Sequence, residues 1–165
     1  MLNWIWGGKE EKKESSGLGG GATEKIVFEG VTVKECLDVI SNCEKYTEFI
    51  EGCVEARKTK DNEDGTFDVF WKASVGGIIN TEYTLRLRVD GDNGFSWVET
   101  DHGPFAKNRG CWTLVDLGNG NVEATYSVNI ELNIWVPGIL RDFLVGTGLP
   151  RTMTAFKKRI EGMKK

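Results

Sequence analysis

The sequence predicts an α+β domain in which a seven-stranded antiparallel sheet packs against one long C-terminal helix. Three observations support this class. Apolar and polar residues alternate strictly from Val122 to Ile134, which is typical of a long strand with one buried face. From about Pro137 to Met163 the pattern is helical, with apolar residues at spacings of three and four after Met153. Shorter alternating runs separated by turn sequences fill the chain from Val54 to Val98.

The bulk composition is that of one globular domain with a tail. The chain has 165 residues, of which 39% are hydrophobic and 28% charged, and its net charge is −4. We expect a flexible tail over residues 1–22, where a Ser/Gly stretch follows a charged run, and a folded domain over residues 23–165. No apolar run approaches the roughly 20 residues of a membrane span, and the start of the chain lacks signal-peptide character. A cytoplasmic location is therefore expected.

The cysteines and the single histidine argue against a metal site. Cys36, Cys43, Cys53 and Cys111 form no C-x-x-C pair and lie in or beside apolar patterns, so we expect reduced core thiols. His102 has no second histidine to join it, whereas zinc sites need several N or S ligands. We therefore expect no metal and no cofactor. No nucleophile, metalloprotease or phosphate-loop motif points to catalytic residues.

The N-terminal part of the domain should form one strand and two short helices. The strand is expected from about Thr23 to Glu29. Thr32 and Glu35 then have the spacing of a capping box, which predicts a helix start at this point. A second short helix is expected from about Cys43 to Phe49.

Five further strands should lie between the two short helices and the long final strand. They are expected over about Cys53–Lys60, Phe67–Val75, Tyr83–Val89, Phe95–Thr100 and Lys107–Leu117. Gly118-Asn119-Gly120 makes the last hairpin. Pairing across this hairpin in simple register predicts that Cys111, Thr113 and Val115 face the core, whereas a bulge would bring Trp112 inward.

The long helix should not be regular throughout. Pro137 suits its first position, because the missing N–H of a proline would have had no partner there. Gly146 to Pro150 combines two glycines with a proline, so we expect a kink or a brief interruption at this segment.

Three sequence blocks carry a resemblance to a known superfamily. They are Tyr46-Thr47-Glu48-Phe49-Ile50, Gly103-Pro104-Phe105 followed by Gly110-x-Trp112-x-Leu114, and Ala155-Phe156-Lys157-Lys158-Arg159. Together with the order of elements, they make residues 23–163 resemble the START-like (SRPBCC) superfamily with its helix-grip fold. Within it, the chain is similar to the coenzyme Q-binding and polyketide cyclase-like family.

The resemblance implies a deep apolar cavity between the curved sheet and the C-terminal helix, able to hold a lipid, a quinone or a polyketide-like molecule. A carrier or chaperone of such a ligand is the function expected. The apolar parity of the strands and helix supplies a wall, with Tyr126 as an internal polar handle and Phe105 in a loop that could gate the cavity. The same side chains could instead form an ordinary packed core. The predicted ligand-binding residues are Trp71, Ala73, Leu85, Leu87, Phe105, Trp112, Tyr126, Val128, Ile130, Leu140, Phe143, Leu144 and Met153.

Two alternative functions stay open. The first is a cyclase or aromatase, for which Glu82, Arg86, Glu99 and Tyr126 would have to converge, although strand parity places Arg86 outside. The second is a ribosome-binding or protein-binding module, because the chain from residue 141 onward carries seven Lys or Arg against two Asp or Glu. The exposed stripe would consist of Arg151, Lys158, Arg159 and Lys165.

Further contacts follow from the tail and the overall charge. Trp4 and Trp6 in the aromatic tip could give a weak peripheral contact with a membrane. No DNA partner is expected for this acidic chain.

Overall fold

The computed structural model describes residues 19–75, 77, 79–133 and 138–163; the side chains of residues 19–20, 75, 79 and 138–149 lie outside the described part. Its elements are β1 (Gly19–Glu29), α1 (Val33–Ser41), the 3-10 helix η2 (Cys43–Glu48), β2 (Cys53–Asp61), β3 (Phe67–Val75), β4 (Ile79–Asp90), β5 (Gly94–Glu99), β6 (Phe105–Asp116), β7 (Asn121–Leu132) and α2 (Gly138–Gly162).

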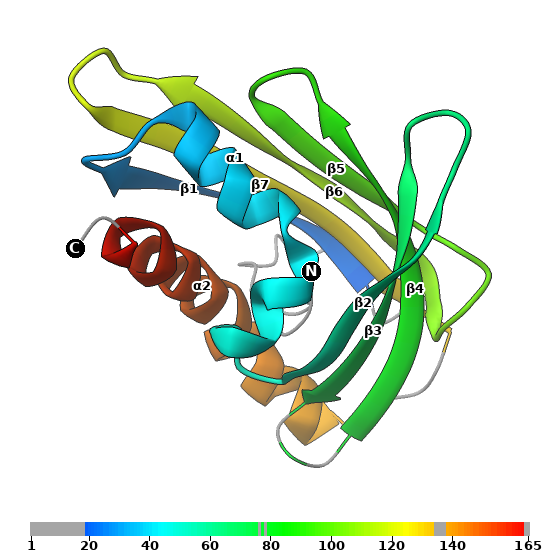
Figure 1. The fold of residues 1–165 in the computed structure, drawn as a ribbon. Helices are drawn as coiled ribbons and strands as arrows, with labels where there is room; N and C mark the ends of the chain where they lie inside the picture. The colour runs from blue at the N-terminus through cyan, green and yellow to red at the C-terminus, as the bar shows by residue number, and fades with distance from the viewer. Residues whose placement is uncertain (1–18, 76, 78, 134–137, 164–165) are drawn as a thin grey trace.

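The strands form one antiparallel sheet in the order β1-β7-β6-β5-β4-β3-β2. Figure 1 shows the sheet curving around α2, with α1 and η2 on the same side of the sheet. Because α1 and η2 follow β1 and precede β2, they connect the two edges of the sheet. The predicted fold class is confirmed: a helix-grip arrangement of seven strands, a C-terminal helix and two short helices between the first two strands.

The N-terminal elements agree with the sequence except at one boundary. β1 begins at Gly19, four residues before the expected start, and pairs with β7 from Gly19↔Glu131 to Glu29↔Asn121. The division into a tail and a domain stays a prediction. The capping box is confirmed, because Thr32 Oγ1 accepts a hydrogen bond from the Glu35 backbone N–H at 3.1 Å, and Glu35 accepts one from the Thr32 N–H.

The last hairpin does not have the simple register, and of the two alternatives Trp112 faces inward. The Leu117 N–H donates to the Asn121 carbonyl at 3.0 Å, which closes a three-residue loop over Gly118-Asn119-Gly120. This closure places Trp112 directly opposite Tyr126, and both are buried. Because paired residues in antiparallel strands share a face, Trp112 faces the core without any bulge in this part of the hairpin. Thr113 and Val115 are exposed and Cys111 is half-buried.

The long helix α2 continues through the segment where an interruption was expected. Helical backbone runs from Gly138 to Gly162 with Pro150 inside it, so the predicted interruption is wrong, and a kink stays a prediction. Pro137 lies outside the described residues. In the second half of α2, Met153, Phe156 and Ile160 are buried as expected, but Met163 is 64% exposed because it lies just beyond the end of the helix.

Three of the four cysteines lie in the core as expected, namely Cys36, Cys43 and Cys53, which are buried. Cys111 is half-buried on the face of β6 opposite Trp112, so its assignment to the core is wrong. All four thiols are free. None of the helices within the described residues contains a stretch apolar and long enough for a transmembrane span.

Candidate functional site

A continuous chain of aromatic rings runs through the interior of the curved sheet. Its members, in order of contact, are Phe105, Tyr83, Trp71, Tyr46, Phe156, Trp112, Tyr126 and Trp97, and we call this set the aromatic chain. The centroids of successive rings lie between 4.9 and 6.5 Å apart. All eight side chains are buried, so aromatic rings fill much of the interior.

The two helices on the inner side of the sheet complete this chain. The ring centroid of Tyr46 in η2 lies 5.4 Å from that of Trp71 in β3, and the centroid of Phe156 in α2 lies 5.0 Å from that of Trp112 in β6. The rings of Tyr46 and Phe156 meet edge-to-face at 5.2 Å. The helices therefore join the β3 side of the sheet to its β6 side, which are separated by β4 and β5 in the sheet order.

Three N–H donors inside the fold have no hydrogen-bond partner. They are Trp71 Nε1, Trp112 Nε1 and Asn108 Nδ2, and they are the buried side-chain N and O atoms of the described residues that lack one. Trp71 and Asn108 are 0% exposed and Trp112 is 1% exposed, so bulk water does not reach them. Leaving such a donor unsatisfied costs about 1–3 kcal/mol, which makes these three positions candidate contacts for a bound acceptor.

Asn108 is held by a tryptophan of the neighbouring strand. Its Oδ1 accepts a hydrogen bond from Trp97 Nε1 at 3.1 Å. The Trp97 ring lies against the backbone of Gly110, where a Cβ atom would come within 2.6 Å of Trp97 Cζ2. Glycine is thus required at 110 by the close approach of an aromatic ring.

An ion pair between Glu99 and Arg109 lies beside Asn108, whose backbone N–H donates to Glu99 Oε2 at 3.4 Å. Glu99 Oε2 accepts a hydrogen bond from Arg109 Nε at 3.2 Å. Burial acts to raise the pKa of Glu99, but the hydrogen bonds from Arg109 and from the backbone outweigh it, so the pKa lies below its usual value. Glu99 is therefore an ionised partner of Arg109 near neutral pH.

The buried tyrosines are neutral phenols. Burial raises the pKa values of Tyr46, Tyr83 and Tyr126 well above the usual tyrosine value. The Tyr46 hydroxyl donates to the Ile40 carbonyl, which ties η2 to α1. Because the best acid–base groups have pKa values near the working pH, Tyr126 is better suited to hydrogen bonding than to proton transfer.

Most of the predicted ligand-binding residues lie in the interior. Trp71, Ala73, Leu85, Leu87, Phe105, Trp112, Tyr126, Val128, Ile130 and Met153 are all buried. Leu140, Phe143 and Leu144 lie in α2, but their side chains are outside the described residues. Trp4, Trp6 and Lys165 also lie outside. Whether the interior residues bind a ligand stays a prediction.

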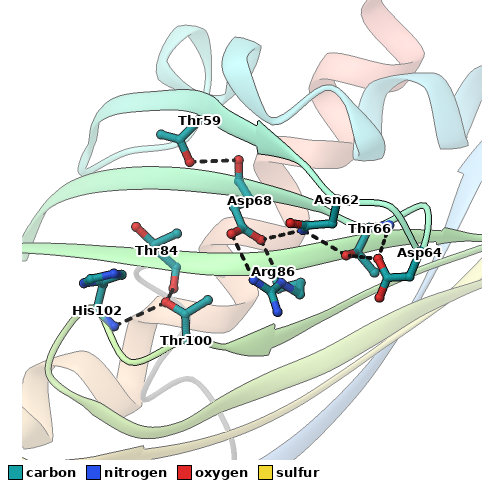
Figure 2. Close-up of polar contacts among 9 residues, drawn as sticks. All are labelled: Thr59, Asn62, Asp64, Thr66, Asp68, Thr84, Arg86, Thr100 and His102. Carbon is teal, nitrogen blue, oxygen red and sulfur yellow. Dashed lines mark hydrogen bonds and ion pairs between the residues drawn. The ribbon is translucent and has the colours of Figure 1, made fainter.

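The loop that was expected to gate the interior is docked on β4. The Thr84 N–H donates to the His102 carbonyl at 2.9 Å, and Thr100 Oγ1 donates to the Thr84 carbonyl at 2.7 Å (Figure 2). Gly103 has a φ of +131°, and a Cβ there would lie 2.4 Å from Tyr83 Cβ. Phe105 then packs edge-to-face on Tyr83 at 4.9 Å. Opening of this loop as a gate stays a prediction.

The acidic and basic residues proposed for a cyclase do not gather around Tyr126. Arg86 is exposed and forms two hydrogen bonds with Asp68, at 2.9 and 3.1 Å (Figure 2). Glu82 is exposed and pairs with Lys72 at 3.3 Å. With Glu99 paired to Arg109, the described residues do not form the proposed acid–base set.

A groove opens between the end of η2 and the second half of α2. It has a volume of about 630 Å³, with Phe49, Ile50 and Ala155 among its lining residues. Ion pairs at 2.9 Å connect its two sides, from Arg151 to Glu51 and from Arg159 to Glu48.

These ion pairs also alter the basic stripe expected on α2. Arg151 and Arg159 each have a carboxylate partner, so their charges are largely compensated. Lys158 is exposed. A strong positive surface, as an RNA partner would require, is therefore not present among the described residues of this stripe.

Sequence reasoning missed several members of the site. Asn108 was overlooked because the simple register of the last hairpin assigned the other face of β6 to the core. Trp97 of β5 was identified only as part of a strand. In the observed register, Asn108 shares the inward parity of Trp112 and Leu114, so a polar residue on an apolar face was the available signal. Tyr46 and Tyr83 were visible only as apolar positions within a helix and a strand.

Comparison with known proteins agrees with this geometry. The sequence model of the family "Polyketide cyclase / dehydrase and lipid transport" matches residues 30–157. Comparison with curated protein sequences gives no significant match. Among solved structures, a START superfamily protein from Mycobacterium smegmatis is similar with a TM-score of 0.73 and 15% identity, over 87% of this chain and 98% of that one.

Two other solved structures have the same fold. The Zhui aromatase/cyclase from Streptomyces sp. R1128 has a TM-score of 0.71 at 11% identity, over 88% of this chain and 93% of that one. Human STARD10 has a TM-score of 0.69 at 10% identity, over 85% of this chain and 62% of that one. At such identities the likeness concerns the fold.

Proposed function

Because the chain belongs to the polyketide cyclase/dehydrase and lipid transport family, we propose that it binds a hydrophobic small molecule between its curved sheet and α2. It acts as a carrier or chaperone of that molecule in the cytoplasm. The ligand would be a lipid, a quinone or a polyketide-like compound. Binding sites of this kind are mostly apolar, with a few polar groups that fix the orientation of the ligand.

The observation that carries this proposal is the set of three buried, unpartnered donors on the inner side of the sheet. In a solid core such donors would be paired or replaced by apolar groups, because each costs stability. A ligand with an acceptor oxygen would compensate each donor that it contacts. The aromatic chain makes the surroundings of these donors apolar, which suits a hydrophobic ligand.

Two competing functions have weaker support. The chain shares its fold with an aromatase/cyclase, which is the support for a cyclase function. Against it, the buried tyrosines are poor proton-transfer groups, and Glu82 and Glu99 are paired with Lys72 and Arg109. A ribosome-binding or protein-binding module would need more uncompensated charge than the described part of α2 provides.

The test is native mass spectrometry and organic extraction of the protein purified gently from its own host. We expect a co-purifying hydrophobic molecule. Ala73→Leu is the critical variant, because Ala73 is buried on the inward face of β3. Next to a cavity, the added carbons should displace the ligand while leaving the fold stable. Ser74→Leu, on the half-buried outward position beside it, is the matched control and should retain the ligand.

A packed core predicts a different result. Ala73→Leu would then lower the free energy of unfolding by about 1–3 kcal/mol, and no bound molecule would be extracted from the wild-type protein or from the variant. An empty protein that co-sediments with ribosomes at low salt would favour the interaction module instead.

A further inference from the structure

We propose that Asn108 determines ligand specificity by donating a hydrogen bond from its amide NH₂ group to a neutral carbonyl oxygen of the ligand. This inference rests on the proposed function, and it names the chemical class of the ligand: an apolar molecule that carries a ketone, quinone or ester oxygen. Three observations carry it: the fixed orientation of the Asn108 amide, the rigid support of that orientation, and the donor-only character of the unpartnered groups.

The orientation of the amide follows from its partner. Trp97 Nε1 carries a hydrogen and can only donate, so the Asn108 atom 3.1 Å away must be the oxygen. The nitrogen Nδ2 therefore points away from Trp97, and it has no partner among the described residues. A flipped amide would place two donors against each other and is excluded.

The support of this orientation is rigid. Trp97 lies against Gly110, where no room for a Cβ exists, and its ring centroid is 5.5 Å from that of Tyr126. On the other side, Asn108 pairs with Ile130 of β7, which is 1% exposed. The amide oxygen is therefore held by Trp97, while the backbone of Asn108 is fixed by its pairing with β7, and a specificity residue needs such support.

The chemical class of the ligand follows from the hydrogen-bond acceptors that the three donors lack. Asn108 Nδ2, Trp71 Nε1 and Trp112 Nε1 are all N–H donors, so the ligand must supply acceptors. An alcohol could also accept these bonds, but its own O–H hydrogen would then need an acceptor, and the three unpartnered groups are all donors. A carboxylate would bring a buried charge, and these three donors carry no compensating positive charge. A carbonyl oxygen meets both conditions.

The experiment compares two probes with the same apolar frame, 9-fluorenone and fluorene, which differ by one carbonyl group. Their Kd values are measured by equilibrium dialysis against the full chain stripped of bound molecules. We expect fluorenone to bind about five- to tenfold more tightly than fluorene, which is the effect of one neutral hydrogen bond. Asn108→Leu should abolish this preference and leave the Kd of fluorene within about threefold.

Asn129→Leu is the matched control. It makes the same chemical change on an exposed position of β7 and should keep the preference for fluorenone. If Asn108→Leu fails to fold because it leaves the Trp97 N–H unpaired, the double variant Asn108→Leu/Trp97→Phe removes both partners and replaces them with apolar groups. It should bind both probes equally.

The outcomes separate this inference from the proposed function. Equal binding of the two probes by the wild-type protein, or a preference that survives Asn108→Leu, overturns the role of Asn108 while the carrier function stands. Failure of both probes to bind, together with the absence of any extracted cargo, overturns the carrier function and this inference with it.

Discussion

Gly110 provides the sharpest test of how the interior is assembled. In Gly110→Ala the new Cβ would lie 2.2 Å from the Ser127 carbonyl oxygen and 2.6 Å from Trp97 Cζ2. The first contact is with backbone of the neighbouring strand β7, so no side-chain rotation relieves it, and β6 and β7 would have to separate locally. Overpacking of this kind costs about 1–3 kcal/mol, and a backbone contact favours the upper end, about 3 kcal/mol.

The assay is urea unfolding followed by far-UV circular dichroism. With a slope of about 2 kcal/mol per M for a domain of this size, the midpoint should fall by about 1–1.5 M. Gly21→Ala is the matched control in the same sheet, because its Cβ would meet only the Val128 carbonyl oxygen, at 3.7 Å. It should change stability by less than about 0.5 kcal/mol. If Gly110→Ala proves as stable as Gly21→Ala, the close approach of β7 and Trp97 to Gly110 is wrong.

Three further predictions concern the rest of the fold. In Asp68→Asn, the loss of stability should be fully present at pH 7. It should begin to shrink as the pH falls below about 4 and disappear only below the lowered pKa of Asp68, because the hydrogen bond from Arg86 stabilises the fold only while the carboxylate is ionised. The free energy of unfolding of both proteins, measured as a function of pH in the acid range, tests this. In Tyr46→Phe, the Ile40 carbonyl loses its donor, and thermal or urea unfolding should show a loss of about 1–2 kcal/mol. With iodoacetamide at pH 8, Cys111 should be alkylated first, because burial raises the pKa values of the other three thiols. Peptide mass spectrometry identifies the alkylated cysteine, and early labelling of Cys36, Cys43 or Cys53 would contradict the packing.

Local patterns were sufficient to predict most of the fold. Strict alternation located β3 and β7 to within about two residues, and the Thr32–Glu35 spacing identified the capping box at the start of α1. These features depend on a few neighbouring residues, so the sequence contains them directly. The boundary of β1 was harder, because Gly19 to Gly21 have low strand propensity and become part of a strand only through pairing with β7.

The candidate site was predictable only in part, because it depends on register. Trp71, Leu85 and Tyr126 were placed in the interior from parity alone. Asn108 could not be found without knowing that a three-residue loop closes the last hairpin, since a shift of one residue exchanges the two faces of β6. The unpartnered state of its amide is a tertiary property, because it depends on what Trp97 already occupies.

The order of strands in the sheet also determines how the chain can reach this structure. Five of its six strand pairings join consecutive strands, whereas β1 pairs with β7 across most of the chain. Lys157 of α2 likewise bonds to the Val27 carbonyl of β1, 130 residues away. Since distant contacts carry the larger loop-closure entropy, the β2–β7 meander can form early as a series of local hairpins. The two ends of the domain then meet last, so the rate of folding should be sensitive to changes within the meander, and the rate of unfolding to changes where β1 and α2 join.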